Sequence, residues 1–331
     1  MVDVFNSLNV QVSCLGNHDL DFGIEKMQEL TAKTQPCKWL MSNFLVKGQP
    51  VGGLDAFTIK EFPLAQSHKR LKIGFFGLAS AEWPDLIVTS VTEEFEYVDF
   101  VEKGREMTMM LKAAPHNCDL VIALTHMRCP DDRKLAENVP EIDLILGGHD
   151  HSYVTEVDQD TGVFMIKSGT DFEEFNDIDV LFDVSEQEYA DAAMRDTELV
   201  KHIFSPQKRM LLRVEKVPIT VDIPTNPKIE AHIKKYATKL NEKMNQVCGY
   251  IDVDLEGRFE YLRYQETNCG NFIADLIRTE FNICEVVILN CGTLRSNSII
   301  PKGQVTNKTL ADLLPMYDKI ILLKVPGDIL L

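Results

Sequence analysis

A short polar stretch at residues 16–23, Gly-Asn-His-Asp-Leu-Asp-Phe-Gly, contains the side chains of this sequence best suited to chemistry. It follows an apolar run that predicts a buried strand, and it precedes apolar residues at helical spacing, at positions 24, 27 and 30. Ligands of α/β proteins bind at such strand ends. Asn17 offers a neutral oxygen ligand, His18 an imidazole, and Asp21 a carboxylate that can orient that imidazole. The alternative is a turn with a helix cap, because Asn and Asp are good caps.

Two further strand-like runs also end in histidines. His126 follows residues 118–125, and His149 and His151 follow residues 142–146. A single histidine at a strand end is more often structural than a ligand, but three such strand ends in one domain favour a metal site. Histidine, carboxylate and amide ligands suit Zn, Mn or Fe ions. His149 and His151 could each serve one of two adjacent ions, and two ions about 3.5–4 Å apart would activate a hydroxide and polarise a phosphoryl oxygen.

The elements that must position these residues alternate between strands and helices. Strands are expected at residues 71–78, 118–125, 142–146, 163–167 and 177–184, and a helix at residues 97–114. This alternation predicts a layered α/β domain over residues 1–214.

A second domain is expected after a proline-rich boundary. Prolines cluster between residues 215 and 228, and apolar residues then recur at helical spacing up to residue 247. We therefore interpret residues 215–247 as a linker and connecting helix. Residues 248–331 would form the second domain, with a helix at residues 268–278 and a buried strand at residues 286–289.

Composition limits the classes of function. The chain has 331 residues, 45% of them apolar, and a formal net charge of −17, which argues against a nucleic-acid partner. No apolar run approaches the ~20 residues of a membrane span, and the first residues lack the pattern of a signal peptide. The eight scattered cysteines, without a CxxC pair, are expected to be free thiols. The location stays open, with the cytoplasm favoured, because any signal peptide would precede the given residues. The expected partner is a small molecule, and nothing in the sequence indicates an oligomeric state.

In combination, the motifs resemble those of a known family. Residues 16–23 (GNHDLDFG), 125–127 (THM) and 147–151 (GGHDH) resemble motifs of the calcineurin-like metallophosphoesterases. Residues 266–271 (ETNCGN), 290–295 (NCGTLR) and 313–315 (LLP) resemble the C-terminal domain of the 5′-nucleotidases in that superfamily. The resemblance implies a metallophosphoesterase β-sandwich flanked by helices, followed by a 5′-nucleotidase substrate-binding α/β domain.

The resemblance implies two divalent metal ions. Asn17, His126 and His149 would bind one ion, and His151 would bind the other. The family's opening motif, Asp-x-His, and its following Gly-Asp are absent upstream of Asn17. They supply the remaining ligands, including the carboxylate that bridges the ions. The metallophosphoesterase domain is therefore expected to lack its first strand and first metal motif, and the C-terminal domain is expected to be incomplete as well.

The resemblance also implies catalytic and substrate-binding residues. His18, oriented by Asp21, would stabilise the leaving oxygen as a general acid. Arg263, Asn290 and Arg295 would hold the substrate, because arginines form charge-assisted bonds with phosphate. In 5′-nucleotidases a Phe usually follows the Leu-Pro of the last motif and stacks on the base. Here Met316 takes that place and Tyr317 follows, which predicts weak selection of the base.

The sequence thus predicts a phosphoric monoester hydrolase of 5′-nucleotidase type, although the 331 residues alone, without the absent ligands, are expected to have little or no activity. It would hydrolyse a nucleoside monophosphate or a related phosphate ester with a hydroxide activated by two metals. The first alternative is a phosphatase acting on a sugar or glycerate phosphate. The second is an inactive relative that binds a ligand: the absent opening motif favours it, and the retained histidines argue against it.

Overall fold

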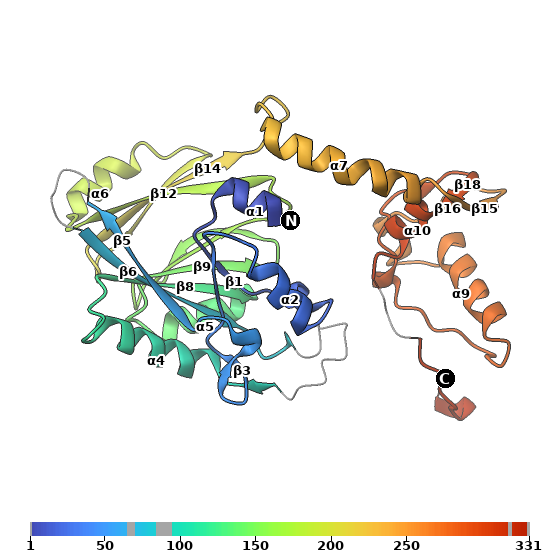
Figure 1. Ribbon diagram of the computed structural model, residues 1–331, viewed down its shortest axis with the longest axis horizontal. Coiled ribbons are helices and arrows are strands. Elements are labelled where there is room, and N and C mark those ends of the chain that lie inside the picture. Colours follow the sequence, from blue (N-terminus) through green and yellow to red (C-terminus); the bar gives the residue numbers. More distant parts are fainter. Residues whose placement is uncertain (1, 65–69, 84–94, 317–319, 330–331) are drawn as a thin grey trace. The chain divides into compact units, whose positions relative to one another are not determined.

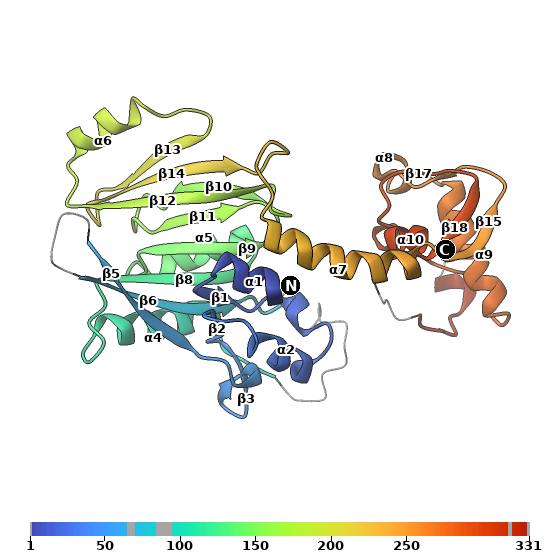
Figure 2. The ribbon, with the colours of Figure 1, turned by 45° about the horizontal axis from the view of Figure 1, so that its top comes forward.

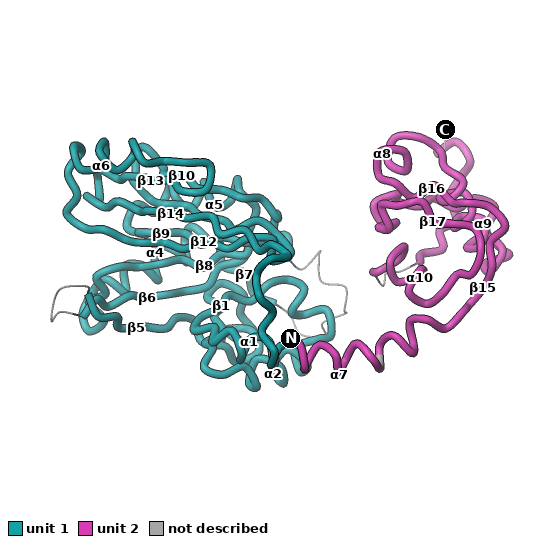
Figure 3. The backbone as a smooth tube through the Cα atoms, turned by 90° about the horizontal axis from the view of Figure 1, so that it is seen from above, with its two compact units in different colours: residues 1–229 teal, residues 230–331 magenta. Residues whose placement is uncertain are grey.

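The structure is a computed structural model that describes residues 2–64, 70–83, 95–316 and 320–329. It divides into two units, residues 1–229 and residues 230–331, which are coloured separately in Figure 3. The predicted boundary at residue 214 lies inside a strand of the first unit, β14 (Met210–Pro218). Each unit has its own core and is described by itself.

A six-stranded sheet forms the centre of the first unit (Figure 1). Its strands, in spatial order, are β10 (Tyr153–Val157), β11 (Phe164–Ser168), β9 (Leu144–His149), β8 (Leu120–Met127), β6 (Arg70–Ala79) and β5 (Phe57–Pro63). The four inner strands run parallel, and the two edge strands pair antiparallel with their neighbours. The inner strands are almost continuously apolar, as strands covered on both faces must be. The predicted strands at residues 71–78, 118–125, 142–146 and 163–167 are confirmed.

A three-stranded antiparallel sheet covers one face of the six-stranded sheet. Its order is β12 (Glu174–Phe182), β14 and β13 (Val200–Ser205). Figure 2 shows it above the larger sheet, with α4 below. Alternate residues of its strands join the inner face of the larger sheet in one apolar cluster: Leu120, Ile122, Leu144, Phe164, Ile166, Met210, Leu212 and Val214. The predicted β-sandwich is therefore confirmed, and the predicted strand at residues 177–184 is β12.

Two helices cover the other face, as the resemblance implies. They are α4 (Phe100–Lys112) and α5 (Cys129–Asn138), and their apolar residues share a cluster with β6, β8 and β9. The Asp99 carboxylate accepts hydrogen bonds from the Val101 and Glu102 amides and so begins α4. The predicted helix at residues 97–114 is α4.

A smaller layer carries the first polar motif. The chain begins with α1 (Val2–Leu8), and β1 (Val12–Cys14) pairs in parallel with β2 (Lys38–Leu40). Between them lie the 3₁₀ turn η1 (Asn17–Leu20) and α2 (Ile24–Thr31). A second short sheet follows, with strands β3 (Phe44–Val46), β4 (Gln49–Pro50) and β7 (Glu96–Tyr97), and η2 (Val51–Gly53) comes after β4. The strand–turn–helix order predicted around residues 16–23 is confirmed.

The amphipathic helix predicted before residue 247 is present, and all but its first three residues belong to the second unit. This helix, α7 (Pro227–Met244), leads into two short antiparallel pairs, β15 (Val247–Ile251) with β18 (Gly303–Thr306) and β16 (Leu255–Glu256) with β17 (Ile299–Ile300). The described residues of the second unit also form the α-helices α8 (Phe259–Leu262), α9 (Asn268–Glu280) and α10 (Asn307–Leu313) and the 3₁₀ turns η3 (Cys291–Thr293) and η4 (Gly327–Ile329). Its core is small, with Leu255, Leu262, Cys269, Ile273, Leu294, Ile300 and Leu313 buried together.

The prediction of a buried strand at residues 286–289 is wrong. Val286 is 60% exposed and Ile288 is 81% exposed, and the segment pairs with no strand in the described part of the chain. It faces an equally exposed apolar segment at residues 321–325 across a groove of about 610 Å³. Apolar, β-branched composition indicates burial only where another layer covers the segment.

Among the helices that the structure describes, none is long and apolar enough to cross a membrane.

Candidate active site

Three strand ends of the first unit bring Asn17, His126 and His149 together. The turn after β1 carries Asn17, and His126 and His149 lie at the ends of β8 and β9. The Nε2 atom of His126 lies 2.9 Å from Asn17 Oδ1 and 3.2 Å from His149 Nδ1. Asn17 is 3% exposed. It contacts His126 although 109 residues separate the two in the chain. The predicted convergence of these three residues is therefore present.

The His126 ring is held tightly from several sides. A Cβ atom at Gly16 would lie 3.0 Å from His126 Cε1, so the glycine allows the ring to pack against the backbone. Trp83 packs edge-on to the ring and donates a hydrogen bond from Nε1 to the His126 carbonyl oxygen, at 3.2 Å. The imidazole thus has little freedom to turn away from Asn17.

The surroundings keep His126 neutral. Burial, followed by the neighbouring His149, lowers the pKa of His126 to about 4. A neutral imidazole has one nitrogen with a free electron pair, which is the form that binds metal ions. The distances also suit a shared ion, because two ligands about 2.1 Å from one ion at a right angle are about 3.0 Å apart.

These donors therefore fit one divalent cation. They are one amide oxygen and two imidazole nitrogens, a donor set that suits Zn, Mn or Fe. Within the described residues, no group of three or more His, Cys, Asp and Glu side chains is arranged to hold a metal ion. His151 is exposed, and its charge contributes to the lowered pKa of His126. The two-metal arrangement stays a prediction.

His18 and Asp21 form the pair that the sequence predicts. His18 Nδ1 lies 2.9 Å from Asp21 Oδ2, and the His18 side chain is 67% exposed. The charge of His18 contributes to the lowered pKa of His126, so the two rings are near one another. Because Asp21 engages Nδ1 and the side chain is largely exposed, the Nε2 atom of His18 can donate a proton to a bound substrate.

The loop that carries His149 and His151 has an unusual backbone. The φ angle is +86° at His149 and +56° at His151. Residues other than glycine rarely adopt the left-handed region, and each such residue costs of order 1–3 kcal/mol. This conformation directs His149 Nδ1 toward His126 at the end of β9.

Glu82 belongs to the site and was not predicted from the sequence. Its Oε1 atom lies 2.9 Å from His149 Nε2, and Arg128 Nε donates to both carboxylate oxygens at 2.8 and 3.1 Å. Although burial opposes it, the hydrogen bonds from Arg128 and His149 lower the pKa of Glu82. The carboxylate orients the imidazole, as carboxylates commonly do for metal-binding histidines. The sequence did contain a signal for Glu82. This residue comes just after the strand at residues 71–78, which runs parallel to the strand of His126 and ends at the same edge of the sheet.

The predicted substrate residues lie in the second unit. The Arg263 guanidinium lies 4.1 Å from the centre of the Phe259 ring, and Arg295 Nε donates to the Gly292 carbonyl oxygen at 2.6 Å. The Asn290 side chain accepts a hydrogen bond from the Gly292 amide at 2.9 Å. All three residues predicted to hold the substrate are exposed.

A side-chain hydrogen bond joins the two segments that carry the arginines. The Asn297 side chain accepts a hydrogen bond from the Phe259 amide at 2.9 Å. Arg263 and Arg295 therefore stand on adjoining segments of one unit. Met316, which is predicted to replace a stacking aromatic residue, is 41% exposed. Tyr317 lies outside the described residues.

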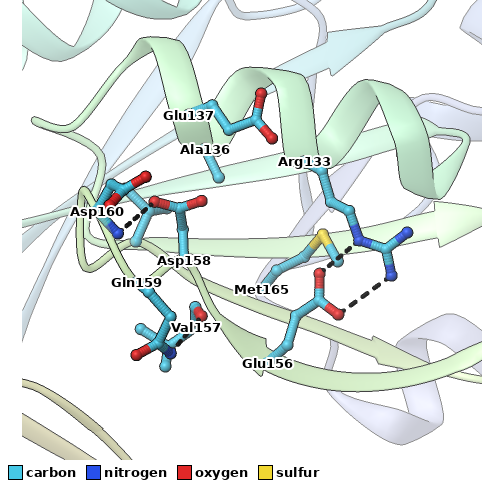
Figure 4. Close-up of a pocket in the computed structure, with 10 residues that line it drawn as sticks. Arg133, Ala136, Glu137, Glu156, Val157, Asp158, Gln159, Asp160 and Met165 are labelled. Atoms are coloured by element: carbon cyan, nitrogen blue, oxygen red, sulfur yellow. Dashed lines mark hydrogen bonds and ion pairs between the residues drawn. The ribbon is translucent and has the colours of Figure 1, made fainter.

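A separate cavity of about 270 Å³ lies between α5 and the β10–β11 hairpin (Figure 4). Arg133 and Glu156 pair across it through two hydrogen bonds of 2.8 and 3.1 Å. The rest of its lining includes Glu137, Asp158 and Asp160, and none of the predicted site residues lines it. Its acidic lining is unsuited to an anionic substrate.

Comparisons with known proteins agree with this architecture. Residues 247–331 match the family model described as the 5′-nucleotidase C-terminal domain. The human 5′-nucleotidase is 25% identical over 344 residues, covering 98% of this chain and 57% of that protein. The chain thus spans a little over half the length of that relative.

Solved structures show the same fold. The 5′-nucleotidase precursor from Thermus thermophilus has a TM-score of 0.67 at 19% identity, covering 92% of this chain and 58% of that chain. The calcineurin-like phosphoesterase YfkN from Bacillus subtilis has a TM-score of 0.54 at 17% identity, covering 73% of each chain. At such identities the likeness shows the fold, which is the one that the sequence motifs imply.

Proposed function

We propose that this chain, which carries a 5′-nucleotidase C-terminal domain in residues 247–331 and resembles 5′-nucleotidases along its length, hydrolyses phosphate monoesters. The observation that supports the proposal is the meeting of Asn17, His126 and His149, with His126 Nε2 within 3.2 Å of both partners. The His18–Asp21 pair is in the same unit and supplies an acid. The substrate class is a nucleoside monophosphate or a related ester.

Asn17, His126 and His149 would hold a divalent cation, and His151 would serve a second one. When bound, the ions supply Lewis-acid polarisation of a phosphoryl oxygen and make a water more acidic. The protein's own contribution is orientation: Asn17 lies in a turn that follows β1, and Glu82 fixes the His149 ring through Nε2. The ligand atoms are thus in place before substrate arrives.

His18 has the geometry of a proton donor to the leaving oxygen. Asp21 accepts the hydrogen bond from His18 Nδ1, so the proton at Nε2 is the one that moves. General acid catalysis of this kind contributes about 10²–10⁴-fold to a rate. Arg263 and Arg295 would bind the anionic part of the substrate through charge-assisted hydrogen bonds.

The test is phosphate release by the full chain, first depleted of metal and then supplied with Mn or Zn. A nucleoside monophosphate and a simple aryl phosphate serve as substrates. Because Asn17, His126 and His149 already converge, we expect metal-dependent turnover even without the absent ligands. This turnover should fall about 10²–10⁴-fold in His18→Gln. His202→Gln is the matched control, because His202 pairs with Asp196 at 2.7 Å on β13 in a similar His–Asp contact. Absence of turnover in the metal-loaded chain would overturn the proposal and favour a ligand-binding relative. Turnover at equal rates in the two variants would overturn the role of His18.

A further inference from the structure

A lysine buried beneath the histidine loops has an unusual environment. The Lys167 side chain, on β11, is 1% exposed. Its ammonium group lies 2.7 Å from Asp132 Oδ2, 2.8 Å from Asp150 Oδ1, 2.8 Å from the Met127 carbonyl oxygen and 2.9 Å from the Gly148 carbonyl oxygen. An ammonium has only three protons, so four oxygen atoms compete for them. The ammonium group of Lys167 therefore holds four acceptor oxygen atoms around itself.

The acceptors come from the segments that carry the candidate metal donors. Met127 follows His126 directly, and Gly148 and Asp150 flank His149. The other Asp150 oxygen accepts a hydrogen bond of 2.6 Å from the Cys129 amide, in the first turn of α5. Through Lys167, the ends of β8 and β9 are fastened to each other and to α5.

The contacts keep this group charged. Burial alone would lower the pKa of Lys167, but Asp132 and Asp150 together raise it. Lys167 therefore stays cationic at neutral pH, held between the carboxyl groups of Asp132 and Asp150.

Stability by itself does not account for such a group. Taking an ion pair out of water costs several kcal/mol per ion, so buried pairs often add little to the free energy of unfolding compared with apolar residues of similar volume. Asp132 and Lys167 are almost completely inaccessible, at 0% and 1% exposure of the side chains. What the pair provides instead is geometry, because it fixes two carbonyl oxygens next to His126 and His149.

We propose that Lys167 is a positioning residue, whose ammonium fixes the His126 and His149 segments so that their nitrogen atoms face a common point. The proposal rests on the proposed function for its catalytic consequence. It also predicts a property of the metal-free protein, which is that the two imidazoles hold one arrangement before any ion binds.

The test removes the cation together with the charge of its most buried partner, Asp132. In Lys167→Met/Asp132→Asn, the buried charge and its most buried partner are both neutralised, whereas Lys167→Met alone would leave the buried Asp132 carboxyl without its cationic partner. The matched control is Arg133→Met/Glu156→Gln. That pair also joins α5 to the β10–β11 hairpin, through hydrogen bonds of 2.8 and 3.1 Å, but does not touch the histidine loops.

The first readout is ¹⁵N-histidine NMR of the full, metal-free chain. We expect one sharp set of His126 and His149 ring signals in the wild type and in the control. In the Lys167 double variant we expect broadened or doubled ring signals, with the thermal unfolding of the first unit retained. The second readout is the affinity for Co²⁺, followed by its visible absorption, which should weaken about 10–100-fold as for other supports of metal ligands. The third is activity, where kcat should fall with little change in KM.

The outcomes separate the two proposals. Ring signals and Co²⁺ affinity unchanged in a folded double variant would overturn the positioning role, whatever the activity. A wild type that binds Co²⁺ but hydrolyses no phosphate ester would overturn the proposed function and leave the positioning role intact. Should the double variant not fold, Lys167→Gln replaces it. If that variant does not fold either, Lys167 is a determinant of folding and the positioning role is overturned.

Discussion

Gly147→Ala should destabilise the first unit far more than the same change at the neighbouring glycine. A Cβ atom at residue 147 would lie 2.7 Å from Lys167 Cε, and 3.1 Å from both Asp132 Oδ2 and Thr125 Oγ1. At Gly148 the Cβ would make ordinary contacts, at 3.4 Å from His126 Nδ1 and 3.8 Å from the Thr125 carbonyl oxygen. The two substitutions are chemically identical and adjacent, so their difference isolates the packing against Lys167.

The magnitude follows from how little Lys167 can move. Carbon atoms in contact are ordinarily about 3.5–4.0 Å apart, so the new methyl group would overlap Lys167 Cε by about 1 Å. The ammonium beyond it is held by four oxygen atoms at 2.7–2.9 Å. Shifting it gives up at least one charge-assisted hydrogen bond, which is worth about 1.5–3 kcal/mol. Together with the strain of overpacking, we expect the free energy of unfolding to fall by about 2–4 kcal/mol.

Urea unfolding followed by tryptophan fluorescence measures this directly. The chain has two tryptophans, Trp39 and Trp83, and both lie in the first unit, so the signal reports that unit alone. With a slope of about 2–3 kcal/mol per molar urea, the midpoint of Gly147→Ala should move by about 1 M. If the free energies of unfolding of Gly147→Ala and Gly148→Ala agree within about 0.5 kcal/mol, the reasoning is refuted. Lys167 would then have moved away from the new methyl group without loss of stability.

Two further predictions concern catalysis. Glu82→Gln removes the charge beside His149 and should lower phosphatase activity about 10–100-fold without loss of fold. The control is Glu61→Gln, which changes a glutamate in the exposed pair with Arg70. Equal activity of the two variants would contradict the role of Glu82. Because Met316 lacks the flat face of an aromatic ring, whose stacking on a base is worth ~1–3 kcal/mol, a nucleoside monophosphate and a sugar phosphate should be hydrolysed at similar rates. A preference for the nucleotide above about a hundredfold, ~2.7 kcal/mol, would count against weak base selection.

The sequence predicted the fold where local pattern and tertiary environment agree. The inner strands are apolar because both faces are covered, and a continuous apolar run is enough to predict them. Such a run does not say what covers it, which is why residues 286–289 were wrongly predicted as buried. The pattern at residues 286–289 and that of β9 look alike in the sequence, and only neighbouring layers distinguish them.

The candidate site divides in the same way. Asn17, His126 and His149 were predicted because metal-binding residue types follow apolar runs, and parallel strands place such ends at one edge. Glu82 and Lys167 were missed because their roles depend on partners distant in the chain. Lys167 is the last residue of a predicted strand, where a lysine normally marks exposure, yet it is 2% exposed. Only the arrangement of four oxygen atoms around it explains the burial.

The left-handed backbone at His149 and His151 sets the proposed metal binding of their imidazoles against the stability of the fold. Glycine would adopt those φ angles of +86° and +56° without strain, and asparagine would do so more readily than histidine. A library of this protein selected only for heat resistance should therefore accumulate glycine or asparagine at both positions. The selected variants would be more stable but would lack the imidazole groups. Keeping the histidines would need a screen that alternates heating with selection for metal binding.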